Sequence, residues 1–195
     1  GPALIPSALY LDFGPVDWSD PLQKKRFDNH CRLAKALNVA VLTMTAAPAG
    51  TPLDDEVARL SGLSATAMRE GLVLAMLTHR DAVTGDPAAA LKLCKAVPGL
   101  GLTLDPSHFV SAKDSEVDQL FPFVQNIHLR DTGKGADEFQ VRIGQGRIEY
   151  ARIVNLLNRA GYNRSLTVAI LDRPDNDFDR EVEVRKLRLL LETLL

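Results

Sequence analysis

Three short segments place reactive side chains directly after apolar runs of the chain. Asp105 and His108 stand three residues apart after one run, His128 and Asp131 close the next, and His79 ends the run before them. Carboxylate oxygen and neutral imidazole nitrogen are good ligands for a divalent ion, and both groups also carry protons. The residue types therefore indicate either a divalent-metal site, which a second carboxylate would normally complete, or acid–base chemistry.

A structural interpretation of these histidines competes with the functional one. Any single histidine at a strand end can simply bond a loop carbonyl, but three on successive runs favour a shared site. His30 lies inside an amphipathic stretch, so we interpret it as structural.

The apolar runs have the length of strands. Most are continuous rather than alternating, which is typical of strands buried on both faces of a parallel sheet. Seven strands are predicted, at residues 8–13, 39–45, 72–78, 100–105, 126–130, 139–143 and 166–172.

The stretches between the runs carry helix signals. Asp20-Pro21, Thr51-Pro52 and Asp86-Pro87 each place a capping side chain before a proline suited to the first helical position. Residues 148–160 repeat apolar positions at helical spacing, as does the C-terminal stretch. Strands alternating with helices predict an α/β fold with a parallel sheet. Seven strands suit an open doubly wound sheet, and a (β/α) barrel needs eight.

Composition limits the function classes. The chain has 195 residues, of which 46% are hydrophobic, and a net charge of −2, which suits one globular domain and argues against nucleic-acid binding. No apolar run approaches the ~20 residues of a membrane span, and no leader is evident. Cys31 and Cys94 lack metal or redox spacing, which predicts reduced core thiols and a cytoplasmic location. Gly1-Pro2 is typical of a protease-cleavage remnant, so the expected domain is residues 3–195.

Three motifs together resemble one family. The pieces LTLDPSH, NIHLRD and IGQGRIEYARIVNLLNRAGYNRSLTVAI follow the order and spacing of the xylose-isomerase-like TIM barrels, which include sugar isomerases and epimerases. The resemblance implies a parallel, TIM-barrel-like sheet that begins at the family's second strand, without the first βα unit. Such a sheet has two open edges, which predicts coverage by a homo-oligomer or by strand exchange.

The resemblance also implies a site. Family members hold Mn²⁺, Mg²⁺ or Zn²⁺ and act on a small sugar or sugar phosphate. By position, Asp105 and His128 match metal ligands. His108 matches a histidine close to metal and substrate and is the expected catalytic residue. Positive charge near the expected mouth suits a phosphorylated or acidic sugar, solvated charge being the alternative. The expected substrate contacts are Arg130, Lys134, Trp18 and His79.

Two positions depart from the family. The two glutamates that bind the metal and move the proton fall on Leu77 and Ala169, which can do neither. The nearest carboxylates, Asp81 and Asp172, lie beyond the strand ends. One hypothesis is therefore a sugar isomerase or epimerase by ancestry with impaired activity, and the alternative is a non-catalytic carbohydrate-binding or structural relative. An endonuclease-type phosphodiesterase and a Rossmann dehydrogenase are disfavoured, because their metal ligands and glycine motif are absent from the sequence.

Overall fold

The computed structural model describes residues 4–14, 16–135, 138–174 and 176–195. Its sheet has six parallel strands whose spatial order is the order of the chain. They are β1 (Leu9–Leu11), β2 (Val41–Thr45), β3 (Val73–Leu77), β4 (Gly101–Leu104), β5 (Val124–Leu129) and β6 (Leu166–Val168). The predicted α/β, TIM-barrel-like class is confirmed.

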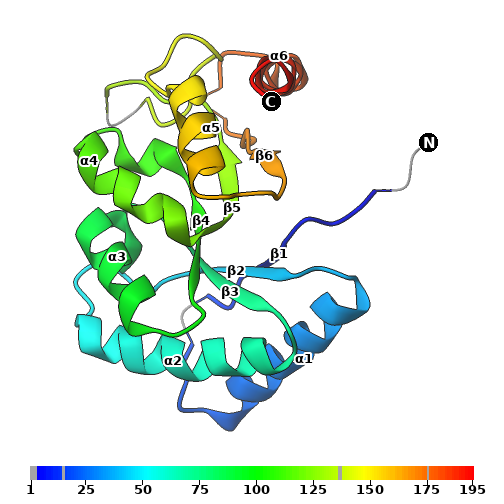
Figure 1. The fold of residues 1–195 in the computed structure, drawn as a ribbon, viewed down its shortest axis with the longest axis vertical. Coiled ribbons are helices and arrows are strands. Elements are labelled where there is room, and N and C mark those ends of the chain that lie inside the picture. The colour runs from blue at the N-terminus through cyan, green and yellow to red at the C-terminus, as the bar shows by residue number, and fades with distance from the viewer. Residues whose placement is uncertain (1–3, 15, 136–137, 175) are drawn as a thin grey trace.

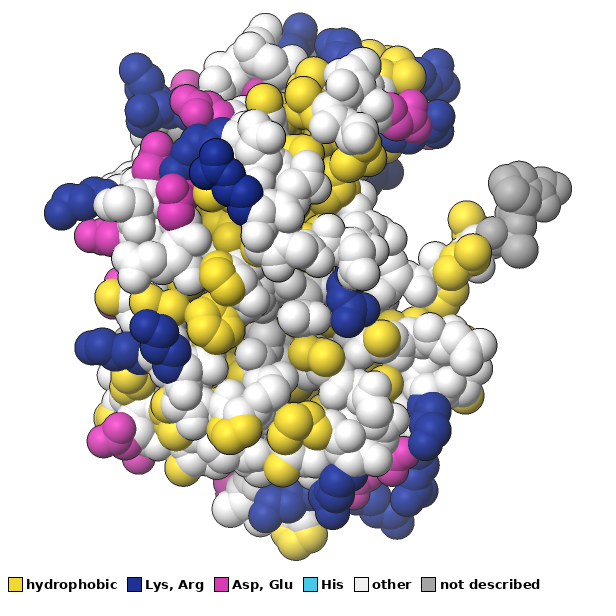
Figure 2. Space-filling view, viewed as in Figure 1, with side chains coloured by type: hydrophobic (Ala, Val, Ile, Leu, Met, Phe, Trp, Pro, Cys, Tyr) yellow, Lys and Arg dark blue, Asp and Glu magenta, His cyan; other side chains and the backbone are white. Residues whose placement is uncertain are grey.

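Helices cover one face of this sheet and leave the other open. They follow the curl of the strands around the outside, so the described chain forms part of a barrel wall (Figure 1). The helices are α1 (Pro21–Ala36), α2 (Leu53–Arg69), α3 (Pro87–Ala96), α4 (Asp114–Val117), α5 (Tyr150–Arg159) and α6 (Arg180–Glu192). A space-filling view shows the open side as a notch in the outline of the molecule (Figure 2).

Capping carboxylates fix where several helices begin. Asp20 accepts a hydrogen bond from the amide of Leu22 at α1, and Asp86 accepts one from Ala88 at α3. In both helices a proline follows the capping aspartate at the first helical position. The missing N–H of proline costs nothing there, because this position makes no hydrogen bond within the helix. The predicted boundaries at these two helices are therefore confirmed. At α2 the proline itself, Pro52, stands at the cap position without a side-chain bond.

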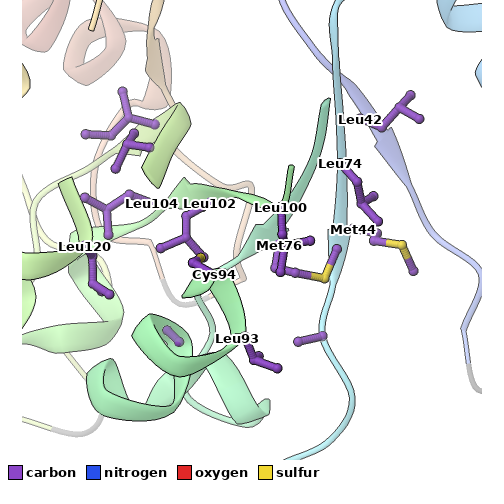
Figure 3. Close-up of a cluster of buried hydrophobic side chains, with 14 of the residues drawn as sticks. Leu42, Met44, Leu74, Met76, Leu93, Cys94, Leu100, Leu102, Leu104 and Leu120 are labelled. Carbon is purple, nitrogen blue, oxygen red and sulfur yellow. The ribbon is translucent and has the colours of Figure 1, made fainter. Parts of the chain in front are cut away.

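The core lies between the strands and their helices. Alternate side chains of β2, β3 and β4 are buried on the helix-covered face of the sheet, together with side chains of α3 (Figure 3). The set drawn there includes Leu42, Leu74, Met76, Leu102, Leu104, Leu93 and Cys94. Both cysteines are free and buried, as core thiols are expected to be.

The concave face carries polar side chains instead. The hydroxyls of Thr43 and Thr103 lie 2.7 Å apart, reaching across β3 where Ala75 has only a methyl group. Asn126 on β5 is buried beside Thr167 on β6, with 3.4 Å between Oδ1 and Oγ1. The outer face of the sheet is thus apolar, whereas the inner face carries paired polar groups on β2, β4, β5 and β6 and apolar side chains on β3.

The expectation of a seventh strand at residues 139–143 is wrong. This segment forms a single antiparallel bridge, between Val141 and Asp131, and β5 pairs directly with β6. Because the β5 ladder is already filled, no strand can enter between them. The Phe139 carbonyl instead accepts the hydroxyl of Thr132, and the Ile143 amide donates to Glu183 on α6.

The ends of the sheet and the helix lengths bear on two further expectations. Strands β1 and β6 are the two edges, as expected for the first segment. In the part of the chain that the structure describes, no helix has both the length and the apolar character needed to cross a bilayer.

Candidate functional site

A buried ion pair occupies the carboxyl end of β4. Asp105 follows this strand and begins a short 3-10 helix (Pro106–Phe109), where its Oδ1 accepts the amide and hydroxyl of Ser107 at 3.1 and 2.5 Å. Its Oδ2 lies 2.8 Å from Nη2 of Arg130, which follows β5. The side chains of Asp105 and Arg130 are 2% and 4% exposed, so water screens this pair weakly.

The Arg130 guanidinium links the ends of three strands. Besides Asp105 at β4, its Nε donates to the carbonyl of Ala169 just after β6, at 2.9 Å. Its carbon lies 4.8 Å from the centre of the Phe139 ring. Burial lowers the pKa of Arg130 and the Asp105 charge raises it, and a guanidinium stays charged in proteins. A fixed positive charge therefore sits among the strand ends where the resemblance places a metal ion.

This arrangement does not fit a divalent metal ion. Asp105, the carboxylate of the expected ligand set, is already neutralised by Arg130. The Nε2 atom of His128 lies 3.4 Å from the side-chain nitrogen of Asn126. That nitrogen is a hydrogen-bond donor, so it occupies the lone pair of Nε2 that a metal ion would need. Within the described residues, no three histidine, cysteine or acidic side chains are grouped as a metal would require. The ligand roles of Asp105 and His128 remain predictions, and these contacts count against them.

His108 is held as a neutral hydrogen-bond donor. Its Nδ1 accepts the backbone amide of Arg80 at 3.3 Å, which leaves the proton of the neutral ring on Nε2. That Nε2 is 3.8 Å from Oδ2 of Asp105. Burial lowers the pKa of His108 to about 3, helped by His79, Arg130 and Arg80. The ring is therefore uncharged at neutral pH and has no free acceptor nitrogen.

His79 and His128 share this neighbourhood. The rings of His79 and His108 are centred 4.3 Å apart, and Nδ1 of His79 accepts the amide of Asp81 at 3.2 Å. Burial lowers the pKa of His128, whereas the charge of Asp105 acts in the opposite direction. The structure thus brings Asp105, His108 and His79 together with Arg130, and the Asp105 charge reaches His128.

Two of the expected substrate contacts, Trp18 and Lys134, are not part of the group formed by Asp105, Arg130 and the histidines in the described contacts. Trp18 packs on Phe13 and Phe27, with the Arg59 guanidinium over its ring, beyond the ends of β1 and β2. Lys134 is exposed in the loop after β5, where its amide donates to Glu138. Their substrate roles remain predictions.

The sequence does not predict three further residues near this site, which are Phe139, Arg80 and Arg173. Phe139 falls in the strand predicted at residues 139–143, yet its ring contacts that of His108, with 4.9 Å between the centroids and 43° between the ring planes. Arg80 and Arg173 also lie over this ring. The sequence signal for Arg80 is that it directly follows His79 after a strand-end segment.

Asp131 organises the loop that follows β5. Its buried carboxylate accepts the amides of Gly144 and Gly146 on Oδ2, at 2.8 and 3.1 Å, and that of Thr132 on Oδ1 at 3.0 Å. A β-carbon at Gly146 would collide with this carboxylate, so only glycine fits there. The Gly144-Gln-Gly146 turn therefore binds the chain's own aspartate through its amides.

Replacing Asp131 with asparagine should lower the free energy of unfolding by about 2 kcal/mol. The new NH₂ group must face either the Thr132 amide or the two glycine amides, which are all donors. Urea denaturation measures the change. Asp177→Asn is the matched control, because Asp177 is 80% exposed and should change stability little. Equal stability of both variants would contradict the role of Asp131.

Comparison with known proteins places this geometry in a family. A model described as Xylose isomerase-like TIM barrel matches residues 3–193. A search of curated proteins finds no match.

Solved structures share the fold at low sequence identity. A xylose isomerase domain protein from Alicyclobacillus acidocaldarius superposes with a TM-score of 0.76 at 20% identity, over 96% of this chain and 76% of the other. A xylose isomerase-like TIM barrel protein from Mycobacterium smegmatis, in complex with magnesium, gives 0.75 at 15%, over 96% and 72%. A D-tagatose 3-epimerase-like protein gives 0.72 at 19%, over 96% and 77%. With the match that spans nearly the whole sequence, the chain belongs to the xylose isomerase-like TIM barrel family.

Proposed function

We propose that this chain binds a small sugar or sugar phosphate at the carboxyl ends of β3 to β6 and that its isomerase or epimerase chemistry is impaired. The observation that carries the proposal is the Arg130 guanidinium, which lies between the Asp105 carboxylate and the Ala169 carbonyl. A positive charge is thereby fixed at the position where the resemblance implies a metal ion. The family membership and the epimerase-like neighbour support a sugar as ligand.

The two positions at which the family places its proton-transferring glutamates carry no base in this chain. Isomerisation or epimerisation needs a group that removes a proton next to a carbonyl. The family's glutamate positions carry Leu77 and Ala169. His108 cannot replace them as it stands, because its acceptor nitrogen is already bonded to the Arg80 amide. Its Nε2–H can still donate to a sugar oxygen, which supports binding.

Two measurements on the purified chain test the proposal. Saturation-transfer NMR with D-fructose should show contact between the sugar and the protein. Incubation of the chain with D-fructose and Mn²⁺, followed by chromatography of the sugars, should show conversion at the level of a protein-free blank.

Matched histidine variants locate the binding. His108→Gln should weaken the saturation-transfer signal, whereas His30→Gln should keep it, because His30 lies on α1 and bonds the Arg26 carbonyl. No signal with the unmodified chain would contradict the binding part. Conversion well above the blank would contradict the impairment.

A further inference from the structure

The proposed binding groups are closed off from solvent in this structure. The side chains of Asp105 and His108 are 2% and 4% exposed, and that of Arg130 is 4% exposed. A sugar oxygen can accept a hydrogen bond from the His108 ring only if it can reach that ring, so part of the protein must move before a ligand binds. The segment that covers these groups therefore controls access to them.

The covering segment is a strap, which we define as residues 138–143. Its Phe139 ring lies against the His108 ring, with 4.9 Å between the centroids. The guanidinium carbon of Arg130 is 4.8 Å from the centre of the same Phe139 ring. Phe139 is half-buried, whereas the side chains of His108 and Arg130 are almost fully buried. The ring therefore forms part of the boundary between these groups and the solvent.

The side chain of Gln140 fastens the strap to the loop that follows β6. Its Oε1 accepts the amide of Leu171 at 2.7 Å, and its Nε2 donates to the Leu171 carbonyl at 3.0 Å and to Oδ1 of Asn176 at 2.9 Å. Leu171 is exposed and Asn176 is half-buried, so water competes for these hydrogen bonds. Each bond of this kind contributes modestly, because the same groups bond to water when they separate. The latch can therefore open at a modest cost in free energy.

The other end of the strap is anchored and has the properties of a hinge. The Ile143 amide donates to the buried carboxylate of Glu183 on α6 at 2.7 Å. The next residue, Gly144, has a φ of 90°, a conformation that glycine adopts at no steric cost. Between the latch and this hinge, the Val141 amide donates to the Asp131 carbonyl at 3.0 Å. That contact is an isolated bridge rather than part of a strand ladder, so lifting the strap leaves the sheet intact.

We propose that residues 138–143 form a gate, closed in this structure by Phe139 and fastened by Gln140, which opens to admit the sugar. This inference rests on the proposed sugar-binding function and describes how access to the same site is controlled. In the closed form, the ring occupies the place beside His108 and Arg130 that a ligand needs. The sugar therefore binds the open form, and its apparent affinity scales with the fraction of molecules that are open.

Hydrogen–deuterium exchange followed by mass spectrometry measures the opening. The Val141 amide is protected by its bond to the Asp131 carbonyl, so peptides that cover the strap report how often it lifts. Gln140→Ala removes the latch bonds and should speed exchange in these peptides about tenfold. Peptides from β5 should keep their exchange rates, which verifies that the variant is folded.

Calorimetric titration with D-fructose connects the opening to binding. Gln140→Ala should bind D-fructose more tightly than the unmodified chain, by the same factor as the exchange rate rises, because both quantities follow the open fraction. Phe139→Ala removes the covering ring itself and should also bind D-fructose more tightly.

Gln119→Ala is the matched control for both measurements. Gln119 is exposed, and its side-chain nitrogen donates to the Ser115 carbonyl at 3.1 Å, so this variant also loses a solvent-exposed carboxamide bond. It should leave the exchange of the strap and the affinity for D-fructose unchanged.

The outcomes separate the gate from the proposed function. Unchanged exchange of the strap in Gln140→Ala overturns the gate, whatever the sugar does. Weaker D-fructose binding by Phe139→Ala also overturns it, because the ring then holds the sugar instead of excluding it. Faster exchange in Gln140→Ala with unchanged affinity overturns it as well. Faster exchange without D-fructose binding by any variant supports the latched strap and overturns the proposed sugar ligand.

Discussion

Replacing Arg130 with methionine should lower the free energy of unfolding by roughly 3–5 kcal/mol. Methionine keeps much of the side-chain volume but leaves the Asp105 carboxylate buried without its cation. It also leaves the Ala169 carbonyl without its donor. Urea denaturation followed by circular dichroism measures the change.

A double-mutant cycle separates the ion pair from general packing. Asp105→Asn combined with Arg130→Met removes both charges, so the double variant should be more stable than the sum of the single effects by about 1 kcal/mol or more. Arg188→Met is the control, because Arg188 pairs with Glu192 on the surface of α6 at 69% and 53% exposure. It should cost less than about 1 kcal/mol. A single Arg130 variant as stable as the control would contradict the buried-pair description.

Divalent-metal affinity should rise only when the site is rebuilt. We expect the unmodified chain to bind Mn²⁺ weakly, because the buried Asp105 carboxylate already pairs with Arg130. Leu77→Glu with Ala169→Glu restores two anionic ligands but leaves the guanidinium among them. Adding Arg130→Gln removes that competing cation, so the triple variant should gain the most, by roughly two orders of magnitude or more over the unmodified chain.

Calorimetric titration with Mn²⁺ ranks these variants. Leu77→Glu or Ala169→Glu alone should raise the affinity for Mn²⁺ less than the two together, since one added carboxylate leaves the ion under-coordinated. Leu189→Glu with Leu190→Glu, both exposed on α6, is a charge-matched control that should not gain affinity. Tight binding by the unmodified chain, or no gain in the triple variant, would show that Arg130 is not what occupies the cation position.

The sequence was sufficient for the general architecture and for the grouping of part of the site. Asp20-Pro21 and Asp86-Pro87 mark helix starts because capping is local, and it depends on residues two or three positions apart. Parallel strands end at one edge of a sheet. For that reason the sequence predicts that Asp105, His108 and His128 lie near one another, with His79 beside them.

Only the tertiary structure decided what these residues do to one another. Residues 139–143 have the local pattern of a strand, but β6 already occupies the ladder of β5, so the segment folds back and offers the Phe139 ring to the site. The Arg130 guanidinium reaches both Asp105 and Ala169 because the sheet curls. These positions are 25 and 39 residues from Arg130 in the chain, a separation over which local propensity carries no information. Whether a buried carboxylate faces a metal ion or a guanidinium depends on distances of a few ångströms, which only the packed strands fix.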